Sequence, residues 1–512
     1  MQLKLYRNIA IYCALAFLTP FWVRMARADE ARMGGNPDSD GSNRTNEDGE
    51  KGIWGAGFFY DHFPLTLEPG YRTETTGPFY YSEQKEDDET TLAVPPLFSN
   101  YHNPAVEHSE FDMLYPLFSN EHYGKEWRWQ FFEVFAFAGG QQPNEDDERR
   151  FTLFPIYFQQ RSGNTNLNYT AVAPFYGHLV NRLFRDRIFF VMFPFYSETQ
   201  KKDVVTDNYC YPFVHVRHGD GLQGWQAWPF AGHEHKILTL ETNGFGDVSV
   251  NAGHDSSFIV WPFWLTAEEN LGTANQETNR ASLPLFTYTR SPMRDSTTVL
   301  WPFFSWIDSR VPGRRYHEWE GPWPFVIFTR GEDKTTDRVF PFFSQSHNAT
   351  QESDSYAWPL YRYKRYQNAA LDEQRTTVAF YLYVGVTLTN KETGWVQKRR
   401  DMLPFFTWRQ DFNGHTRLQV LAPIEPILAN SRGIQRNWSP LWSVWRQEWN
   451  TKTGATSASL LWNLYRRDER VEVDGTEHKK ISLLFGLFRY QREGGNSETR
   501  WFYLPALHSH KK

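Results

Sequence analysis

The chain has 512 residues, a formal net charge of −6, and aromatic residues at 17% of its positions. Its pI near 6.3 excludes the basic footprint that a nucleic-acid partner requires. The mean hydropathy is only −0.63 despite the aromatic content, so large aromatic groups must alternate with strongly polar stretches. That alternation is typical of many short strands joined by solvated loops.

Residues 1–28 have the features of a signal peptide. Lys4 and Arg7 form the charged region, an apolar stretch runs from Ile9 to Val23, and Ala26-Arg27-Ala28 provides a cleavage site. The alternative is an uncleaved membrane anchor, for which the apolar stretch is short. We therefore expect an exported protein.

Cysteine usage indicates the compartment more closely. Cleavage after Ala28 removes Cys13 and leaves Cys210 alone, so packing and hydrogen bonds, not an internal disulfide, must stabilise the fold. Secreted eukaryotic β-proteins of this size often have several disulfides, which favours a bacterial envelope protein. No later segment has the long apolar run of a transmembrane helix.

The rest of the chain divides into three parts. Residues 29–52 are rich in Asp, Glu, Gly, Ser and Asn, which predicts a disordered polar leader. Residues 53–507 form a single β-repeat domain, because one motif recurs throughout them. Residues 508–512 are expected to be a polar tail.

The repeated motif is an apolar or aromatic residue, a proline, an apolar residue and then usually an aromatic one, as in Phe193-Pro194-Phe195-Tyr196 and Trp301-Pro302-Phe303-Phe304. Neighbouring copies are mostly about 17 to 22 residues apart, which is typical of a repeat architecture. The motif prolines are residues 64, 78, 96, 116, 155, 174, 194, 212, 229, 262, 284, 302, 324, 341, 359, 404, 423, 440 and 505.

Turn-forming, charged stretches separate the motifs. One of them, Asp411 to Gly414, contains an Asn-Gly dipeptide, the strongest short hairpin signal. No stretch has sustained helical periodicity, and a helix would meet a proline in nearly every repeat. The sequence therefore predicts an all-β antiparallel meander of roughly 20 to 24 strands, each about 9 to 13 residues long, with the motif inside the strand.

The motif, read as a strand, is apolar on both faces, as in Thr298 to Trp306. Strands of this kind are covered on both sides, by a second sheet, by a filled barrel interior or by lipid. In signal peptide, strand length and aromatic content the chain resembles bacterial outer-membrane barrels. That resemblance implies a large barrel with lipid-facing stripes such as Phe189, Val191, Phe193 and Phe195.

Two features argue against a membrane barrel. Proline has no N–H, so prolines at one level of every strand would leave a belt of missing hydrogen bonds. Outer-membrane barrels also usually end in an aromatic residue, whereas this chain continues past Trp501-Phe502-Tyr503 to His508 and Lys512. A soluble or peripherally attached barrel-like or stacked sheet therefore stays open as the alternative.

The candidate metal ligands are His215, His218, His233 and His235, which are expected on adjacent strands around a Gly-rich loop. Imidazoles two residues apart share a strand face, so His233 and His235 could bind one transition-metal ion. The favoured interpretation is surface histidines near a strand end, and no cofactor is predicted.

Signals of catalysis are few. Glu318-Trp319-Glu320 places two carboxylates on one strand face beside an aromatic residue, a pattern compatible with glycoside hydrolysis, but solvated carboxylates are the favoured interpretation. Acidic loops at Glu86 to Glu89 and Glu145 to Glu148 lack a complete calcium-loop pattern. Cys210, between two tyrosines, is expected to be a small packed residue.

The sequence thus predicts a non-enzymatic envelope protein at the outer membrane or cell surface, with a pore, transport or assembly role. Its expected partners are outer-membrane lipid or other envelope components. The alternative is a soluble periplasmic or surface scaffold whose exposed Trp and Tyr bind glycans by stacking on sugar rings.

Overall fold

The computed structural model describes residues 57–85, 88–132, 135–140, 149–242, 248–471, 475–502 and 507–510. The predicted signal peptide and polar leader, and the acidic loop at residues 145–148, lie outside these ranges. The described residues form one antiparallel sheet of 43 strands and a separate two-stranded hairpin. Successive strands pair in chain order, so the sheet is a meander, as predicted.

The strands are four to eight residues long. The first part of the meander contains β1 (Asp61–Pro64), β2 (Gly70–Thr75), β3 (Tyr80–Lys85), β4 (Thr90–Val94), β5 (Phe98–Asn103), β6 (His108–Met113), β7 (Phe118–Tyr123), β8 (Glu126–Phe131), β9 (Phe135–Gly139), β10 (Arg149–Leu153), β11 (Tyr157–Arg161), β12 (Tyr169–Val172), β13 (Tyr176–Arg182), β14 (Arg185–Val191), β15 (Tyr196–Lys201), β16 (Val204–Tyr209), β17 (Val214–Gly219), β18 (Leu222–Ala227) and β19 (Ala231–Lys236). The separate hairpin is β20 (Thr239–Thr242) and β21 (Val248–Asn251).

The second part begins at β22, which pairs with β19. It contains β22 (Gly253–Ile259), β23 (Trp264–Leu271), β24 (Glu277–Ser282), β25 (Phe286–Ser291), β26 (Arg294–Val299), β27 (Phe304–Ser309), β28 (Tyr316–Glu320), β29 (Val326–Gly331), β30 (Lys334–Val339), β31 (Phe343–Asn348), β32 (Gln351–Tyr356), β33 (Tyr361–Gln367), β34 (Leu371–Val378), β35 (Tyr383–Asn390), β36 (Val396–Met402), β37 (Phe406–Gln410), β38 (Thr416–Val420), β39 (Trp445–Trp449), β40 (Thr456–Leu460), β41 (Tyr465–Val471), β42 (Glu477–Leu483), β43 (Phe488–Glu493), β44 (Asn496–Trp501) and β45 (Leu507–His510).

Helical segments in the described ranges are few and short. They are η2 (Gly57–Phe59), η3 (Gly77–Phe79), η4 (Pro104–Val106), η5 (Thr165–Leu167), η6 (Ala379–Tyr381), α2 (Arg432–Asn437) and α3 (Ser439–Trp442). Both α-helices lie in the connection between β38 and β39. None of the helices in the described ranges is long and apolar enough to cross a bilayer.

The predicted fold class is confirmed, but the predicted 20 to 24 long strands were wrong. Each repeat of about 20 residues contains two short strands, because the motif forms the turn between them. Trp301-Pro302 lies between β26 and β27, for example, and Trp358-Pro359 lies between β32 and β33. Proline lacks the N–H group that a strand interior needs for its ladder hydrogen bonds, whereas this position of a turn needs no N–H donor.

Hydrogen bonds within and between turns define the motif. In the turn from Met192 to Phe195, the Phe195 N–H donates to the Met192 carbonyl at 2.8 Å, and the Phe193-Pro194 peptide is cis, which makes it a type VI turn. The next motif turn, between β16 and β17, then bonds to this one, since the Tyr211 N–H donates to the Pro194 carbonyl at 2.7 Å. Similar bonds join other successive turns, so the ladder of the sheet continues through its turns.

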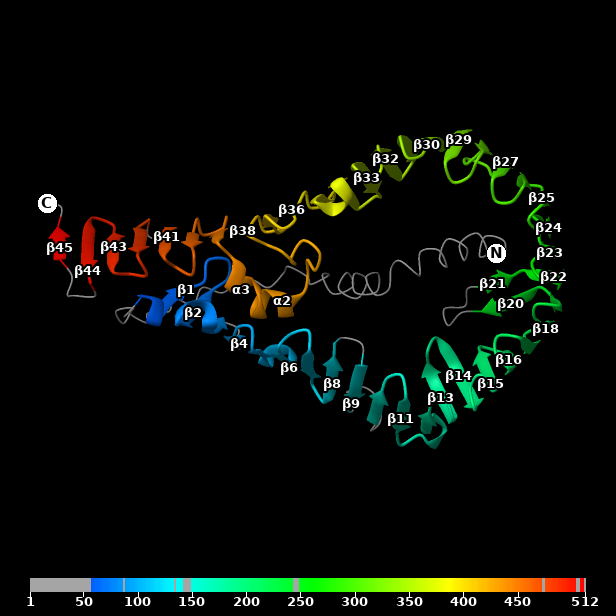
Figure 1. Cartoon of the computed structure of the whole chain (residues 1–512), viewed down its shortest axis with the longest axis horizontal. Coiled ribbons are helices and arrows are strands. Elements are labelled where there is room, and N and C mark those ends of the chain that lie inside the picture. The colour runs from blue at the N-terminus through cyan, green and yellow to red at the C-terminus, as the bar shows by residue number, and fades with distance from the viewer. Residues whose placement is uncertain are drawn as a thin grey trace.

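The sheet is a long ribbon that curves back on itself into a teardrop-shaped loop (Figure 1). Its first strands, β1 to β4, lie beside its last strands, from β38 onward, with α2 and α3 between them. Within the described residues, β1 pairs only with β2 and β45 only with β44, so the meander does not close into a barrel. The two ends stack face to face instead, and β45 continues the sheet into the segment assigned to a polar tail.

A cluster on α2 fastens the two ends together, and we call it the clasp. The guanidinium of Arg436 lies 2.5 Å from Glu110 and 3.0 Å from Asp112, both on β6. Asn437 donates to the Ser99 hydroxyl on β5 at 2.9 Å and to Asp112 at 3.2 Å. Asn437 and Asp112 are fully buried, so α2 is held by a dry, hydrogen-bonded polar contact.

The stacked ends also bury charged side chains against each other. Arg466 on β41 pairs with Asp468 at 2.8 Å, and its guanidinium carbon lies 3.3 Å from the ring centre of Phe63 on β1. Asn463 donates to Glu74 on β2 at 2.8 Å. Arginine presents a planar face to an aromatic ring while its donors bind carboxylates, which suits a core made of both.

Candidate functional site: the aromatic edge of the sheet

The meander separates its turns onto two edges. Alternate connections of a meander lie on the same edge of the sheet, and here nearly all the motif turns occupy one set of alternate connections. We call this long edge the motif edge. The connections on the opposite edge, which we call the polar edge, contain the charged and Asn-rich stretches.

The motif edge exposes large hydrophobic side chains along its whole described length. Phe230 and Phe342 are 70% exposed and Phe195 is 62% exposed. The exposed hydrophobic residues of these turns include Phe79, Leu97, Leu114, Phe132, Phe154, Ile156, Phe175, Met192, Phe193, Phe195, Tyr211, Phe213, Phe230, Val260, Phe263, Leu285, Leu300, Phe303, Phe325, Phe342, Trp358, Leu360, Phe380, Tyr381, Leu382, Phe405, Leu421, Ile427, Leu461, Trp462, Leu484 and Phe502.

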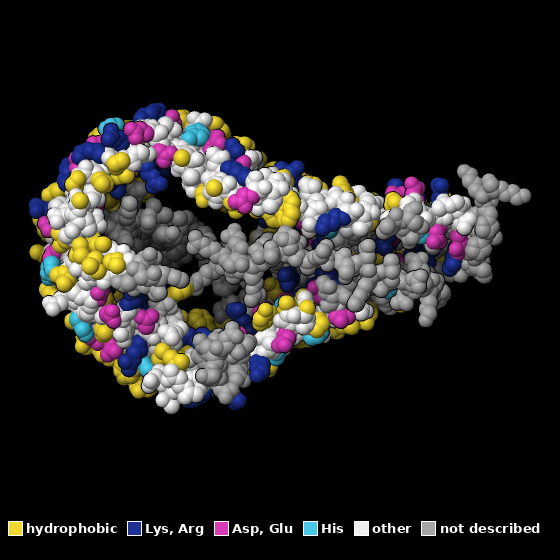
Figure 2. Space-filling view, turned by 180° about the vertical axis from the view of Figure 1, so that it is seen from behind, with side chains coloured by type: hydrophobic (Ala, Val, Ile, Leu, Met, Phe, Trp, Pro, Cys, Tyr) yellow, Lys and Arg dark blue, Asp and Glu magenta, His cyan; other side chains and the backbone are white. Residues whose placement is uncertain are grey.

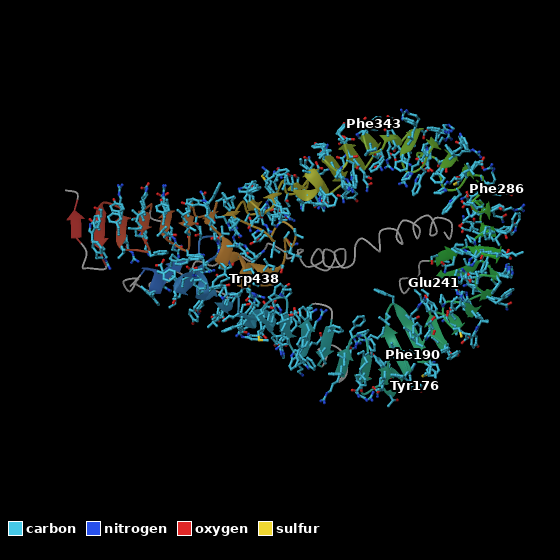
Figure 3. All side chains as sticks on the ribbon, viewed as in Figure 1. Tyr176, Phe190, Glu241, Phe286, Phe343 and Trp438 are labelled. Carbon is cyan, nitrogen blue, oxygen red and sulfur yellow. The ribbon has the colours of Figure 1, made fainter. Side chains whose placement is uncertain are left out.

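A row of apolar side chains continues this surface onto the convex face of the ribbon. On successive strands, the residues nearest the motif edge pair with one another across the sheet and are apolar. One such run is Tyr176, Val191, Tyr196, Tyr209 and Val214, in which each residue pairs with the next. A second run continues through Val339, Phe343, Tyr356, Tyr361 and Val378. Figure 3 shows Tyr176, Phe286 and Phe343 on the outside of the curve. The turns and this row together make one apolar band.

Hydrophobic groups recur around the curved part of the loop in the space-filling view, between charged ones (Figure 2). Aromatic neighbours in the band contact one another: the rings of Phe193 and Tyr211 are 5.9 Å apart, and those of Phe340 and Trp358 are 5.3 Å apart. These contacts order the band but leave most of its outer surface open to solvent.

The polar edge has a different chemistry. Asn348, Asn390 and Asn450 each accept two backbone N–H groups of their own turns through the side-chain oxygen. This local bonding explains the preference of turns for Asn and Asp. Leu183 and Phe184 are exceptions, since both are exposed hydrophobic residues on this edge.

The predicted metal ligands are divided between the faces of the sheet. His233 and His235 share the convex face, and their Nδ1 atoms lie 3.9 and 3.0 Å from the two oxygens of Asp255. His218 also faces outward, 3.9 Å from Asp207. His215, three residues before His218, lies on the concave face, where burial lowers its pKa. The structure therefore brings His233 and His235 together, and it separates His215 from them.

A different group meets the geometry of a metal site more closely. In the described ranges, single ligand atoms of His347, Glu352 and Asp354 all lie within 4.8 Å of one another. These residues are on the adjacent strands β31 and β32, where His347 pairs with Glu352. No sequence pattern pointed to this group, because its members become neighbours only through the strand register.

The predicted carboxylate pair does not adjoin an aromatic platform. Glu318 and Glu320 are buried on the concave face, while Trp319 faces outward from the same strand. Glu318 accepts a hydrogen bond from Thr329 at 2.7 Å and pairs with Lys334 at 2.5 Å. This carboxylate is thus engaged within the sheet.

The prediction that Cys210 is packed was wrong. Cys210 is exposed because it is the first residue of a motif turn, and its φ of 48° is matched by the corresponding Met192 and Leu300. Its neighbour Tyr211 is also exposed. The thiol therefore lies on the apolar band.

A polar cavity of about 490 Å³ lies between the stacked ends, with seven basic and five acidic side chains in its lining. Most of these charges are paired; Glu448, for instance, binds Arg417 at 2.8 Å and Arg446 at 2.6 Å. Opposing cations lower the pKa of Glu448 to about 2 against the effect of burial. Arg409 is different, because its buried Nε has no hydrogen-bond partner among the described residues.

Comparison with known proteins adds no identity. No protein-family model matches this sequence, and no curated protein matches it either. The apolar band and the two faces of the sheet are therefore the features that point to a function.

Proposed function

We propose that this chain is a non-enzymatic envelope protein that attaches to a membrane by its motif edge and acts as a curved scaffold in transport or assembly at the outer membrane. The observation that carries this proposal is the continuity of the apolar band along one edge, opposite an edge of polar turns. A protein with one apolar edge and one polar edge has a preferred orientation at an oil–water boundary.

The size of the band supports a membrane as its partner. The largest apolar patch on an ordinary soluble monomer covers a few hundred Å², whereas this band follows a sheet of 43 strands. Its composition is rich in Phe, Trp and Tyr, the residues that favour the membrane interface. A long, narrow and curved band is also a poor match for a single compact protein surface.

Strand length favours shallow insertion over a transmembrane arrangement. A strand that crosses a bilayer needs about 9 to 11 residues, and the strands here have four to eight. Burial of the turns and the first outer row would place the apolar side chains at the depth of interfacial proteins, about 5 to 10 Å into the headgroup and acyl boundary. The concave face, with its Ser, Thr, Arg and Glu side chains, would stay in water.

Cys210 provides a direct test, since it lies on the band and is exposed. In a Cys13→Ser background, the thiol is labelled with an environment-sensitive fluorophore, and vesicles of phosphatidylethanolamine and phosphatidylglycerol are added. We expect a blue-shifted, brighter emission and flotation of the protein with the vesicles. The matched control has Cys210→Ala and Thr350→Cys, which moves the label to the polar edge and should show no shift.

A second set of variants tests the band itself. Phe195→Ser, Phe230→Ser and Phe342→Ser together remove three exposed rings, and loss of about 1 kcal/mol each would weaken vesicle binding about 100-fold. The control, Met293→Ser with Trp395→Ser, removes exposed apolar groups from the polar edge and should leave binding unchanged. Equal binding by both variants, or no shift of the Cys210 label, would contradict the proposal and favour the soluble glycan-binding scaffold.

A further inference from the structure

The concave face changes character between β11 and β16. Elsewhere it is mostly polar, as at the Thr298 and Ser305 hydroxyls, which lie 3.0 Å apart. Here it holds a buried apolar cluster of Phe158, Tyr169, Ala171, Leu179 and Phe190. Phe158, Leu179 and Phe190 of this cluster form the floor of an apolar cavity of about 690 Å³, which is within the size range of small-molecule sites.

The cluster is a built feature of the sheet, since a glycine makes room for it. A Cβ on Gly177 would lie 2.3 Å from the Ala171 Cβ and 2.5 Å from the Phe190 ring. Gly177 pairs with Phe190 across the ladder, so the ring lies against the glycine. Figure 3 shows Phe190 on the inner side of the ribbon and Tyr176 on the outer side.

The two ends of the cavity differ in chemistry. At the motif edge its lining includes Phe154, Phe193 and Tyr211, all exposed turn residues of the apolar band. At the other end the lining includes Arg185, whose guanidinium has no partner among the described residues, and Arg217, which pairs with Glu234 at 2.6 Å. The cavity therefore runs across the sheet from an apolar opening to a basic end.

We infer that this cavity holds the acyl chain of an anionic lipid, with the chain toward the motif edge and the headgroup toward Arg185. The inference rests on the proposed function for the source of the lipid, because the band would place the opening of the cavity at the membrane. Burial of each methylene of the chain favours binding, and an unpaired guanidinium complements a phosphate or carboxylate.

The walls favour a hydrocarbon chain over a peptide. The floor strands β11 to β15 pair with neighbours on both sides, so they offer no free sheet edge to an added strand. A peptide would also bring amide groups into an apolar cavity, and an unpaired buried amide is costly. A hydrocarbon chain brings no such groups.

The test uses the full chain in detergent-free buffer with 11-(dansylamino)undecanoic acid as the fluorescent probe. We expect saturable binding that myristic acid displaces and that methyl myristate displaces about tenfold less well. Arg185→Glu should remove that preference for the free acid while the variant still binds the probe.

Two variants fill or charge the cavity. Leu179→Arg places a charge on the floor of the cavity. Thr199→Trp fills the cavity from its polar wall and leaves the apolar cluster intact. The test stays decisive as long as one of the two variants folds. Each should weaken probe binding at least about tenfold. Val216→Arg, on the convex face, is the matched control and should bind the probe like the wild type.

Vesicle flotation of the same proteins separates the two proposals. A wild type that floats but does not bind the probe would overturn the lipid cavity and leave membrane attachment intact. Probe binding without flotation would overturn membrane attachment and leave the lipid cavity intact. Unchanged probe binding by Thr199→Trp would also overturn the cavity as the binding site.

Discussion

The guanidinium of Arg436 lies 3.0 Å from the carboxylate of Asp112, although 324 residues separate them in the chain. Both side chains are buried, and the pair joins α2 to β6 where the two ends of the ribbon meet. The sheet pairs β6 only with its neighbours β5 and β7, so this pair, like the contacts of Arg466 with Phe63 and of Asn463 with Glu74, joins strands that the meander itself does not connect.

The first prediction concerns removal of that guanidinium. Arg436→Ala leaves Asp112 and Glu110 buried without their cation, which typically costs about 3 to 5 kcal/mol. Urea unfolding should show this loss, and small-angle X-ray scattering should show a larger radius of gyration as the ends separate. Arg330→Ala, which removes an exposed pair with Asp337, should cost less than about 1 kcal/mol. Equal effects of the two would show that the clasp does not hold the ends.

The second prediction is a pH dependence at the clasp. Burial raises the pKa of Asp112 from 3.8 to about 6, with Arg436 acting in the opposite direction. A raised pKa means that the folded state binds the proton more tightly, so the stability from this group is fully present below pH 3.8 and is lost as the pH rises through about 6. The free energy of unfolding should therefore fall by up to about 3 kcal/mol over this window.

Asp112→Asn isolates that effect, since asparagine does not titrate. The difference between wild type and variant, measured by urea unfolding from pH 4 to pH 7, should change across this window and become constant above it. A difference that is flat from pH 4 to pH 7 would show that Asp112 keeps an ordinary pKa in the folded protein.

The third prediction concerns the glycine beneath the Phe190 ring. Gly177→Ala introduces a Cβ within 2.5 Å of the ring, and overpacking of this kind costs about 1 to 3 kcal/mol. Gly495→Ala is the matched substitution, because a Cβ there meets nothing within 4 Å. Thermal unfolding should show a lower Tm for Gly177→Ala and a Tm near that of the wild type for Gly495→Ala. Two equal values would mean that β13 and β14 adjust without cost.

The fourth prediction reverses the usual sign of a core substitution. Burial, aided by Arg399 and Arg417, lowers the pKa of Arg409 to about 10, and its Nε lacks a hydrogen-bond partner in the described part of the chain. Arg409→Met should therefore be neutral or stabilise the protein by about 1 kcal/mol. Arg466→Met, which breaks the buried pair with Asp468, should destabilise it by about 3 kcal/mol. A loss at Arg409 as large as that at Arg466 would indicate an anionic partner for Arg409.

The all-β meander was predictable because its signals are local. Turn residues recur at a fixed period, and no stretch has helical periodicity, so strand order follows directly from the sequence. The number of strands was not predictable from the same pattern, because Phe193-Pro194-Phe195 has the composition of a strand centre. The proline of this motif indicates a turn, because a residue without an N–H group is disfavoured in a strand interior and is common in turns.

The clasp, and the placement of the candidate histidines on opposite faces of the sheet, could not be predicted from the sequence for a different reason. Arg436 and Asp112 meet through the curvature of the whole ribbon, and no spacing in the sequence encodes that curvature. His215 and His218 are close in the chain, but strand geometry turns side chains an odd number of residues apart to opposite faces. The apolar band was visible as aromatic content, while its position on one edge required the strand boundaries.

The open meander also has an evolutionary consequence. Each hairpin contacts little beyond the hairpins beside it, as in solenoid proteins whose units contact only their neighbours. A tandem duplication or deletion of one whole hairpin in the curved region would keep the register, the two edges and the turn-to-turn bonds. Homologous chains can therefore differ in length by multiples of about 20 residues, and the span that the loop encloses would widen or narrow with each copy while the clasp stays the same.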